Sequence, residues 1–78
     1  MLSGSKLKDL TRERNMDIGR LAGHLAHGTM DAADAASAIR NWMKGLYKPI
    51  PTTGDVERLA NGLGVEPREL SVWSATLR

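Results

Sequence analysis

The sequence contains no cysteine and no phenylalanine. Without cysteine, neither a disulfide nor a thiolate metal site can stabilise the fold, so an apolar core must do so. Its 78 residues suffice for one small domain, which we expect to span residues 1–78. Aliphatic residues, alanine, methionine and two tryptophans have to fill the core, and this set suits helices better than strands. The lack of disulfides also fits the cytoplasm, the compartment that we expect.

Long apolar runs and a strong net charge are missing as well. No run approaches the roughly 20 residues of a membrane span, and Met1–Lys6 lacks the apolar stretch of a signal peptide, so we expect no membrane partner. The formal net charge is only +2. Residues 1–30 are mildly basic, whereas the segment from Pro51 onward is slightly acidic. A basic front half is compatible with a phosphate-bearing partner but is not specific for one.

Helical signals dominate the chain. Apolar residues recur at helical spacing, and neither an alternating strand pattern nor an internal repeat is present. Gly28 and Gly45 are expected to end the second and third helices, because glycine often follows a helix C-terminus. The candidate N-caps are Ser3 or Ser5, Asp17, Thr29 or Asp31, and Thr52 or Thr53. The chain is predicted to be all-α, with helices at about 5–14, 17–27, 30–44, 54–62 and 66–73.

Two segments in the second half carry a family pattern. Residues 39–49 read Ile-x-x-Trp-x-x-Gly-x-x-x-Pro, and residues 59–70 read Leu-Ala-x-x-Leu-Gly-Val-x-x-x-x-Leu. This ordered set resembles the Cro/CI-type (XRE-family, lambda-repressor-like) helix-turn-helix domain, and Leu21-Ala22 is similar to the pair on that family's second helix. The likeness covers roughly residues 3–73 and implies a five-helix DNA-binding fold.

The helical spacing and the resemblance agree on a core. Ile39 and Trp42 are expected to pack the third helix inward, with Trp42 in the core rather than stacked on a base. Pro49 would stiffen the exit from that helix. The predicted core residues are Leu7, Leu10, Leu21, Ala22, Leu25, Ile39, Trp42, Leu59, Ala60, Leu63, Val65 and Leu70.

The chain departs from the family pattern in length and at one contact position. Ile18 stands where the family often has a glutamine that contacts DNA, and isoleucine cannot make that hydrogen bond. Additional residues on both sides of Gly28 predict lengthened second and third helices. Roughly five of them would extend the third helix by about 7 Å at its N-terminal end, which family members place in the major groove.

The expected reading positions of the third helix also have an unusual composition. Ala35–Ala38 occupy them, preceded by Asp31 and Asp34. Base reading needs side chains such as Arg, Lys, Asn or Gln, whereas alanine offers only a methyl contact and carboxylates repel phosphates. The first half of this helix is therefore predicted to serve packing and helix formation rather than readout.

Candidate nucleic-acid contacts remain in the second half of this helix and around it. Tyr47, between Lys44 and Lys48, is equally consistent with a solvated loop and with a phosphate or base contact. The basic residues of the first helix matter only if they share a face with Arg40, Lys44 and Lys48; otherwise they are a solvated helix surface. The predicted contacts are Ser37, Arg40, Asn41, Lys44, Tyr47, Lys48, Arg14 and Arg20.

The chain offers no catalytic or metal-binding arrangement. His24 and His27 lack further ligands at useful spacing and are interpreted as surface or half-buried residues near a helix end. Asp31 and Asp34 are interpreted as helix-start charges rather than catalytic carboxylates. We therefore expect no enzyme activity, no metal and no cofactor.

Two functions remain open. The first is a DNA-binding transcription regulator with weak sequence readout, which would act as a homodimer because such modules bind operators as two-fold pairs. The second is an accessory module that docks on ribosomal RNA or on a protein. Residues 1–7, 39–49 and 63–73 look similar to an N-terminal extension that some bacteria carry on the large-subunit ribosomal protein lining the exit tunnel.

Overall fold

The computed structural model describes residues 2–28 and 30–71. They form four α-helices and one short 3-10 helix, which are α1 (Gly4–Glu13), α2 (Ile18–Leu25), α3 (Ala32–Met43), α4 (Thr53–Leu63) and η1 (Pro67–Leu70). The described residues contain two isolated β-bridges and no longer strand pairing. The all-α prediction is confirmed, but the structure has four α-helices where five were predicted.

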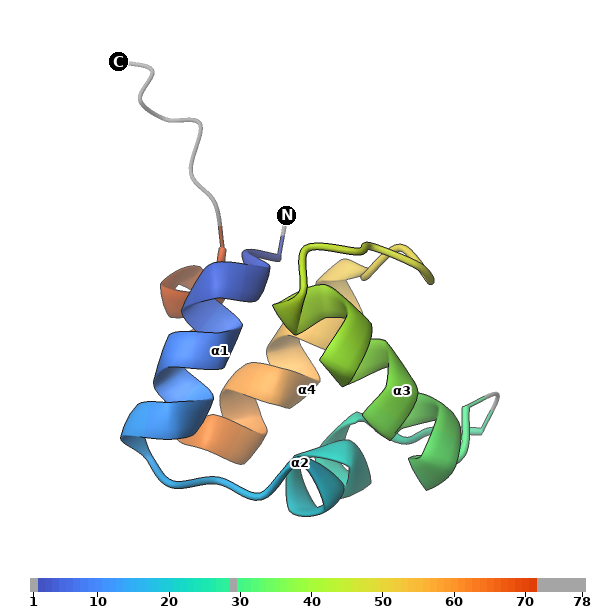
Figure 1. Ribbon diagram of the computed structural model, residues 1–78. Coiled ribbons are helices and arrows are strands. Elements are labelled where there is room, and N and C mark those ends of the chain that lie inside the picture. Colours follow the sequence, from blue (N-terminus) through green and yellow to red (C-terminus); the bar gives the residue numbers. More distant parts are fainter. Residues whose placement is uncertain (1, 29, 72–78) are drawn as a thin grey trace.

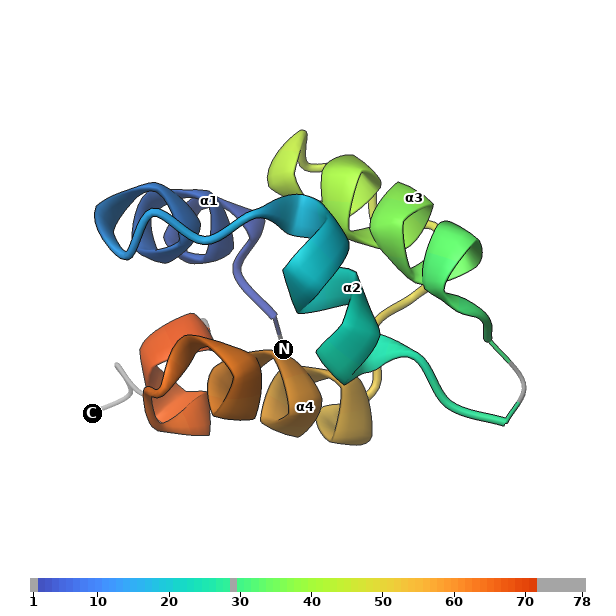
Figure 2. The ribbon, with the colours of Figure 1, turned by 90° about the horizontal axis from the view of Figure 1, so that it is seen from below.

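The helices form two layers with α2 between them. Figures 1 and 2 show α1 and α3 side by side in one layer, with α4 and η1 in the other. Helix α2 packs against both α3 and α4, and so closes one end of the domain. No helix in the described part of the chain is long and apolar enough to cross a membrane.

Short polar side chains begin each α-helix. Ser3, Asp17, Asp31 and Thr52 each accept a hydrogen bond from the backbone amide three residues further on. These bonds satisfy amides that have no partner within the helix. The caps therefore fall on four of the predicted candidates, whereas Thr29 lies outside the described residues.

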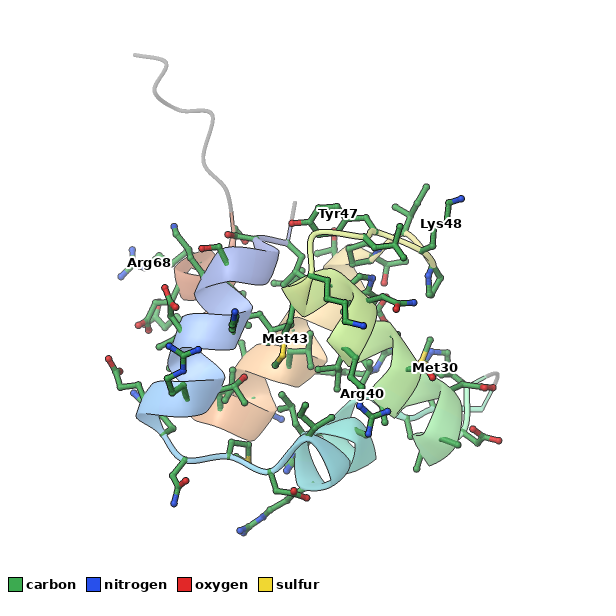
Figure 3. All side chains as sticks on the ribbon, viewed as in Figure 1. Met30, Arg40, Met43, Tyr47, Lys48 and Arg68 are labelled. Carbon is green, nitrogen blue, oxygen red and sulfur yellow. The ribbon has the colours of Figure 1, made fainter. Side chains whose placement is uncertain are left out.

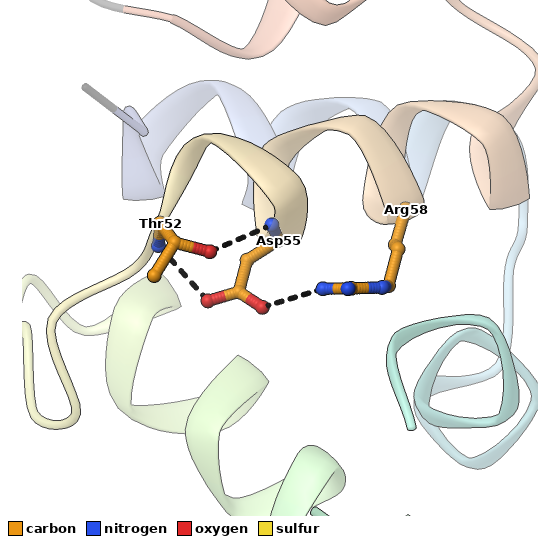
Figure 4. Close-up of polar contacts among 3 residues, drawn as sticks. All are labelled: Thr52, Asp55 and Arg58. Atoms are coloured by element: carbon orange, nitrogen blue, oxygen red, sulfur yellow. Dashed lines mark hydrogen bonds and ion pairs between the residues drawn. The ribbon is translucent and has the colours of Figure 1, made fainter. Parts of the chain in front are cut away.

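Helix α4 has a more extensive start, drawn in Figure 4. The Thr52 hydroxyl accepts from the Asp55 amide at 3.1 Å, and the Asp55 carboxylate accepts from the Thr52 amide at 2.9 Å. The second oxygen of Asp55 pairs with Arg58 at 3.2 Å. Asp55 is buried, so the two bonds to its carboxylate, from the Thr52 amide and from Arg58, compensate for the loss of water around its charge.

The core lies where these four helices and η1 meet. Of the predicted core residues, only Leu10 and Val65 are not buried; both are half-buried and pack against the core from its edge. Leu10 is near the end of α1, and Val65 follows Gly64, where the chain leaves α4 in a left-handed conformation. The buried apolar set is Leu2, Leu7, Leu21, Ala22, Leu25, Ala35, Ala38, Ile39, Trp42, Val56, Leu59, Ala60, Leu63 and Leu70.

Helices α2 and α3 are shorter than the predicted ranges 17–27 and 30–44. Helix α2 ends at Leu25 with Ala26 as its C-cap in an extended conformation, so Gly28 does not end it. His27 and Met30 then exchange two backbone hydrogen bonds, of 2.9 and 3.0 Å, before α3 begins at Ala32. These bonds take the place of helical ones between the end of α2 at Leu25 and the start of α3 at Ala32.

The predicted helix at 66–73 is also shorter than expected. Pro67 starts it, one residue after the predicted start at 66, but the helix is a 3-10 turn that ends at Leu70. The amide of Ser3 donates to the Leu70 carbonyl at 2.7 Å, and Leu2 pairs with Ser71 in an antiparallel bridge. Pairing with the N-terminal segment therefore replaces further helical bonds, while residues 72 and 73 lie outside the described residues.

The start of α1 approaches the end of α3 very closely. A Cβ atom at Gly4 would collide with the carbonyl oxygen of Trp42. The amide of Gly4 donates to the hydroxyl of Tyr47 at 2.9 Å. Glycine at this position therefore allows α1 and α3 to lie side by side, and this contact positions the site described next.

Candidate nucleic-acid interface

Helix α3 has one buried and one exposed face. Ala35, Ala38 and Ile39 are buried, and the small alanine side chains allow α3 to pack closely on its neighbours. Ala35 and Ala38 therefore cannot read bases, although the family pattern places them among the reading positions. Ser37, Arg40 and Lys44 are exposed and follow one another at helical spacing along the opposite face.

The charges along α3 are divided between its two ends. Asp31 and Asp34 stand at its N-terminal end, where they complement the helix dipole. Arg40 and Lys44 stand in its second half, four positions apart, so that their side chains are neighbours on the surface. The N-terminal end of α3 is thus acidic, and its C-terminal half is basic.

The cations of this second half have no acidic partner in the described part of the chain. The ion pairs between described residues engage Arg58 with Asp55 and Arg68 with Glu66. Arg40, Lys44 and Lys48 are exposed and take part in neither. Lys44 also lies at the negative end of the α3 dipole, which favours a cation there for structural reasons.

A groove of about 410 Å³ separates α1 from the end of α3. We call it the α1–α3 groove, and Figure 3 shows Met43 between the two helices that form it. It brings Lys8 and Arg12 of α1 onto the same surface as Lys44 of α3. The residues that line it are Ser5, Lys8, Asp9, Arg12, Met43, Lys44, Gly45 and Tyr47.

The predicted contact residue Asn41 and the core residue Trp42 have structural hydrogen bonds. The Asn41 side-chain amide donates to the carbonyl of Lys48 at 3.0 Å. Trp42, which is fully buried, donates from Nε1 to the carbonyl of Pro49 at 2.7 Å. These two bonds hold the chain after α3 against the helix, and Figure 3 shows the Lys48 side chain directed away from the domain.

Tyr47 is neither a fully solvated loop residue nor a free aromatic surface. Its side chain is half-buried, and its hydroxyl accepts the hydrogen bond from Gly4. That bond satisfies one of the amides at the start of α1 that have no partner within the helix. Tyr47 nevertheless lines the α1–α3 groove, so part of this half-buried residue is accessible there.

The remaining predicted contacts do not line the groove. Arg14 lies at the other end of α1, where its guanidinium is 3.9 Å from the position that a Cβ atom would take at Gly64. Arg20 is exposed in the first turn of α2. The structure thus separates Arg14 and Arg20 from the groove, whereas Lys44 and Tyr47 belong to it.

The histidines lie away from this surface. A Cβ atom at Gly62 would come within 2.9 Å of the His24 ring, so His24 packs over α4. His27 belongs to the connection between α2 and α3. No group of three or more His, Cys, Asp or Glu side chains that could hold a metal ion occurs among residues 2–28 and 30–71.

Sequence reasoning did not select Lys8 and Arg12 as contacts. Their four-residue spacing places them on one face of α1, but the same spacing is typical of any solvated helix. Only the packing of α1 beside α3 puts them next to Lys44. Together with Arg40 and Lys44 they form what we call the basic face.

No family model, curated protein or solved structure matches this chain.

Proposed function

We propose that this chain is a non-catalytic helix-turn-helix module that binds nucleic acid mainly through phosphate contacts. The family pattern of its second half favours the DNA-binding, transcription-regulator type. The observation that carries the proposal is the basic face, in which four exposed cations from two helices have no acidic partner in the described chain. Phosphate contacts provide most of the affinity of such surfaces, and they depend little on sequence.

The contact surface would be the second half of α3 with α1. In the helix-turn-helix family the N-terminal end of the recognition helix enters the major groove. Here Asp31 and Asp34 would bring that end into repulsion with phosphates. Arg40 and Lys44 are therefore the primary phosphate contacts, Ser37 is a secondary one, and base readout is weak.

Docking on structured RNA is the alternative, and the burial of Ala35 and Ala38 favours it. A regulator needs side chains that reach base edges, and these two positions provide none. An accessory module on ribosomal RNA needs only shape and phosphate contacts. The solution mass separates the two functions, because a regulator of this type is expected to be a homodimer.

Fluorescence anisotropy with labelled duplex DNA and with a structured RNA, at several salt concentrations, tests the proposal. Replacing Arg40 and Lys44 by glutamine removes two phosphate contacts. For duplex DNA we expect the slope of log affinity against log salt to become shallower by about 1.8, which is about 0.9 for each contact.

The matched control removes two cations elsewhere. Lys6 donates to the carbonyl of Ser71, and Arg68 lies on η1, on the far side of α1 from α3 (Figure 3). Replacing both by glutamine lowers the net charge equally, and we expect the salt slope to remain as in the native chain. Equal weakening by both double variants would show a nonspecific charge effect and contradict the proposed surface.

A further inference from the structure

The α1–α3 groove combines cations with an apolar surface. Lys8, Arg12 and Lys44 contribute three positive charges and Asp9 one negative charge, so the groove has a net formal charge of +2. Met43 and the ring of Tyr47, both half-buried, provide its apolar part. A surface that served only the phosphates of a duplex would not need this apolar part.

The size and shape of the groove match one nucleotide better than a double helix. Its volume of about 410 Å³ falls within the range of about 300–1,000 Å³ that is usual for small-ligand sites. Two helices packed side by side leave space for one strand between their side chains. In a duplex the bases are stacked on their neighbours, so none of their faces could reach Met43 or Tyr47.

Proteins that bind single strands combine a positive groove with an aromatic side chain on which a base stacks. The hydrogen bond between Tyr47 and Gly4 fixes the ring before any ligand arrives, so little conformational entropy is lost on stacking. Asp9 cannot hold a phosphate, but its carboxylate can accept a hydrogen bond from the amino group of a base.

We propose that the α1–α3 groove binds one unpaired nucleotide, with its phosphate near Lys8, Arg12 and Lys44 and its base against Met43 and Tyr47. This inference rests on the proposed function and specifies its partner as a nucleic acid with a single-stranded segment. The phosphates on either side of that nucleotide would continue along α3 towards Arg40.

Competition between strand states tests this site. The probes are a labelled single strand of about 12 nucleotides, within the usual site size for such proteins, and the duplex of the same sequence. We expect the single strand to bind at least about five-fold more tightly at equal salt, the lower limit of what one stacked base contributes. Replacing Lys8 and Arg12 by glutamine should abolish this preference and make the single-strand salt slope shallower by about 1.4.

The methionine methyl groups report where the strand lies. With methyl-labelled methionine, the Met43 resonance should shift when the single strand is added. Met16 and Met30 do not line the groove, so their resonances should stay in place. Both methionines serve as controls within the same sample, and their unchanged resonances in the double variant would show that it is folded.

The outcomes separate the two proposals. Equal affinities for single strand and duplex, or an unmoved Met43 resonance under saturating strand, would overturn the groove site. If binding still depended on Arg40 and Lys44, the proposed function would stand. Absence of binding to both probes at low salt would overturn the two proposals together.

Discussion

The hydrogen bond between Tyr47 and Gly4 allows a test of whether the Tyr47 hydroxyl stabilises the fold or contacts a ligand. Replacing Tyr47 by phenylalanine keeps the ring and removes only the hydroxyl that accepts from the Gly4 amide. Leaving a buried donor without a partner costs about 1–3 kcal/mol. Tyr47 is half-buried and water can partly replace the hydroxyl, so we expect a loss of about 1 kcal/mol of unfolding free energy, near the lower end.

For a domain of this size, that loss lowers Tm by about 4–8 °C. Thermal unfolding followed by circular dichroism measures the shift, and urea unfolding should show a lower midpoint with an unchanged m-value. Ile50, which is 76% exposed on the same connection, is the control, and its replacement by alanine should leave Tm unchanged.

Affinity for the single strand completes the experiment. The phenylalanine ring can still stack on a base but is no longer held by the Gly4 amide, so binding at a temperature well below Tm should weaken only slightly. An unchanged Tm together with lost binding would refute the reasoning, because the hydroxyl would then act on the ligand and not on the start of α1.

The remaining predictions concern packing and capping, and urea unfolding measures all of them. Gly4→Ala forces α1 away from the carbonyl of Trp42 and should cost about 1–3 kcal/mol or more, a small effect being incompatible with the close approach described. Ala35→Leu overfills the core beneath α3 and should cost a similar amount. Its control, Ala33→Leu on the exposed face, should change stability by less than about 0.5 kcal/mol. Thr52→Ala removes one half of the α4 capping box and should cost about 1 kcal/mol.

The parts of this fold that depend on nearby residues were predictable from the sequence. Each cap is a short polar side chain followed by a helical apolar pattern, so local sequence places the starts of the four α-helices to within two residues, although it left two candidate caps open for three of them. The buried faces follow for the same reason, because three- and four-residue spacing determines which side chains share a face. Leu10 and Val65 are less buried than predicted, since their exposure depends on how far neighbouring elements extend.

The parts that depend on distant residues were not predictable. The bridge between Leu2 and Ser71, which limits η1, joins opposite ends of the described chain. Gly28 and Asp31 mark locally that a helix ends and another begins near here, but the pairing of His27 with Met30, which accompanies the earlier end of α2 at Leu25, has no local sequence signal. The sequence gives the weakest indication of the α1–α3 groove, because Lys8 and Lys44 lie on one surface only when α1 packs against α3, which Gly4 allows.

The bridge between Leu2 and Ser71 also bears on how such a module can be carried by a larger polypeptide. Residues paired in this way have Cα atoms about 4.5–5.5 Å apart. Adjacent residues of any chain have Cα atoms about 3.8 Å apart, which is only slightly less than the distance across the bridge. The segments of a host protein that enter and leave this domain could therefore lie next to each other. The same fold is thus suited to insertion within a surface loop as well as to attachment at one end.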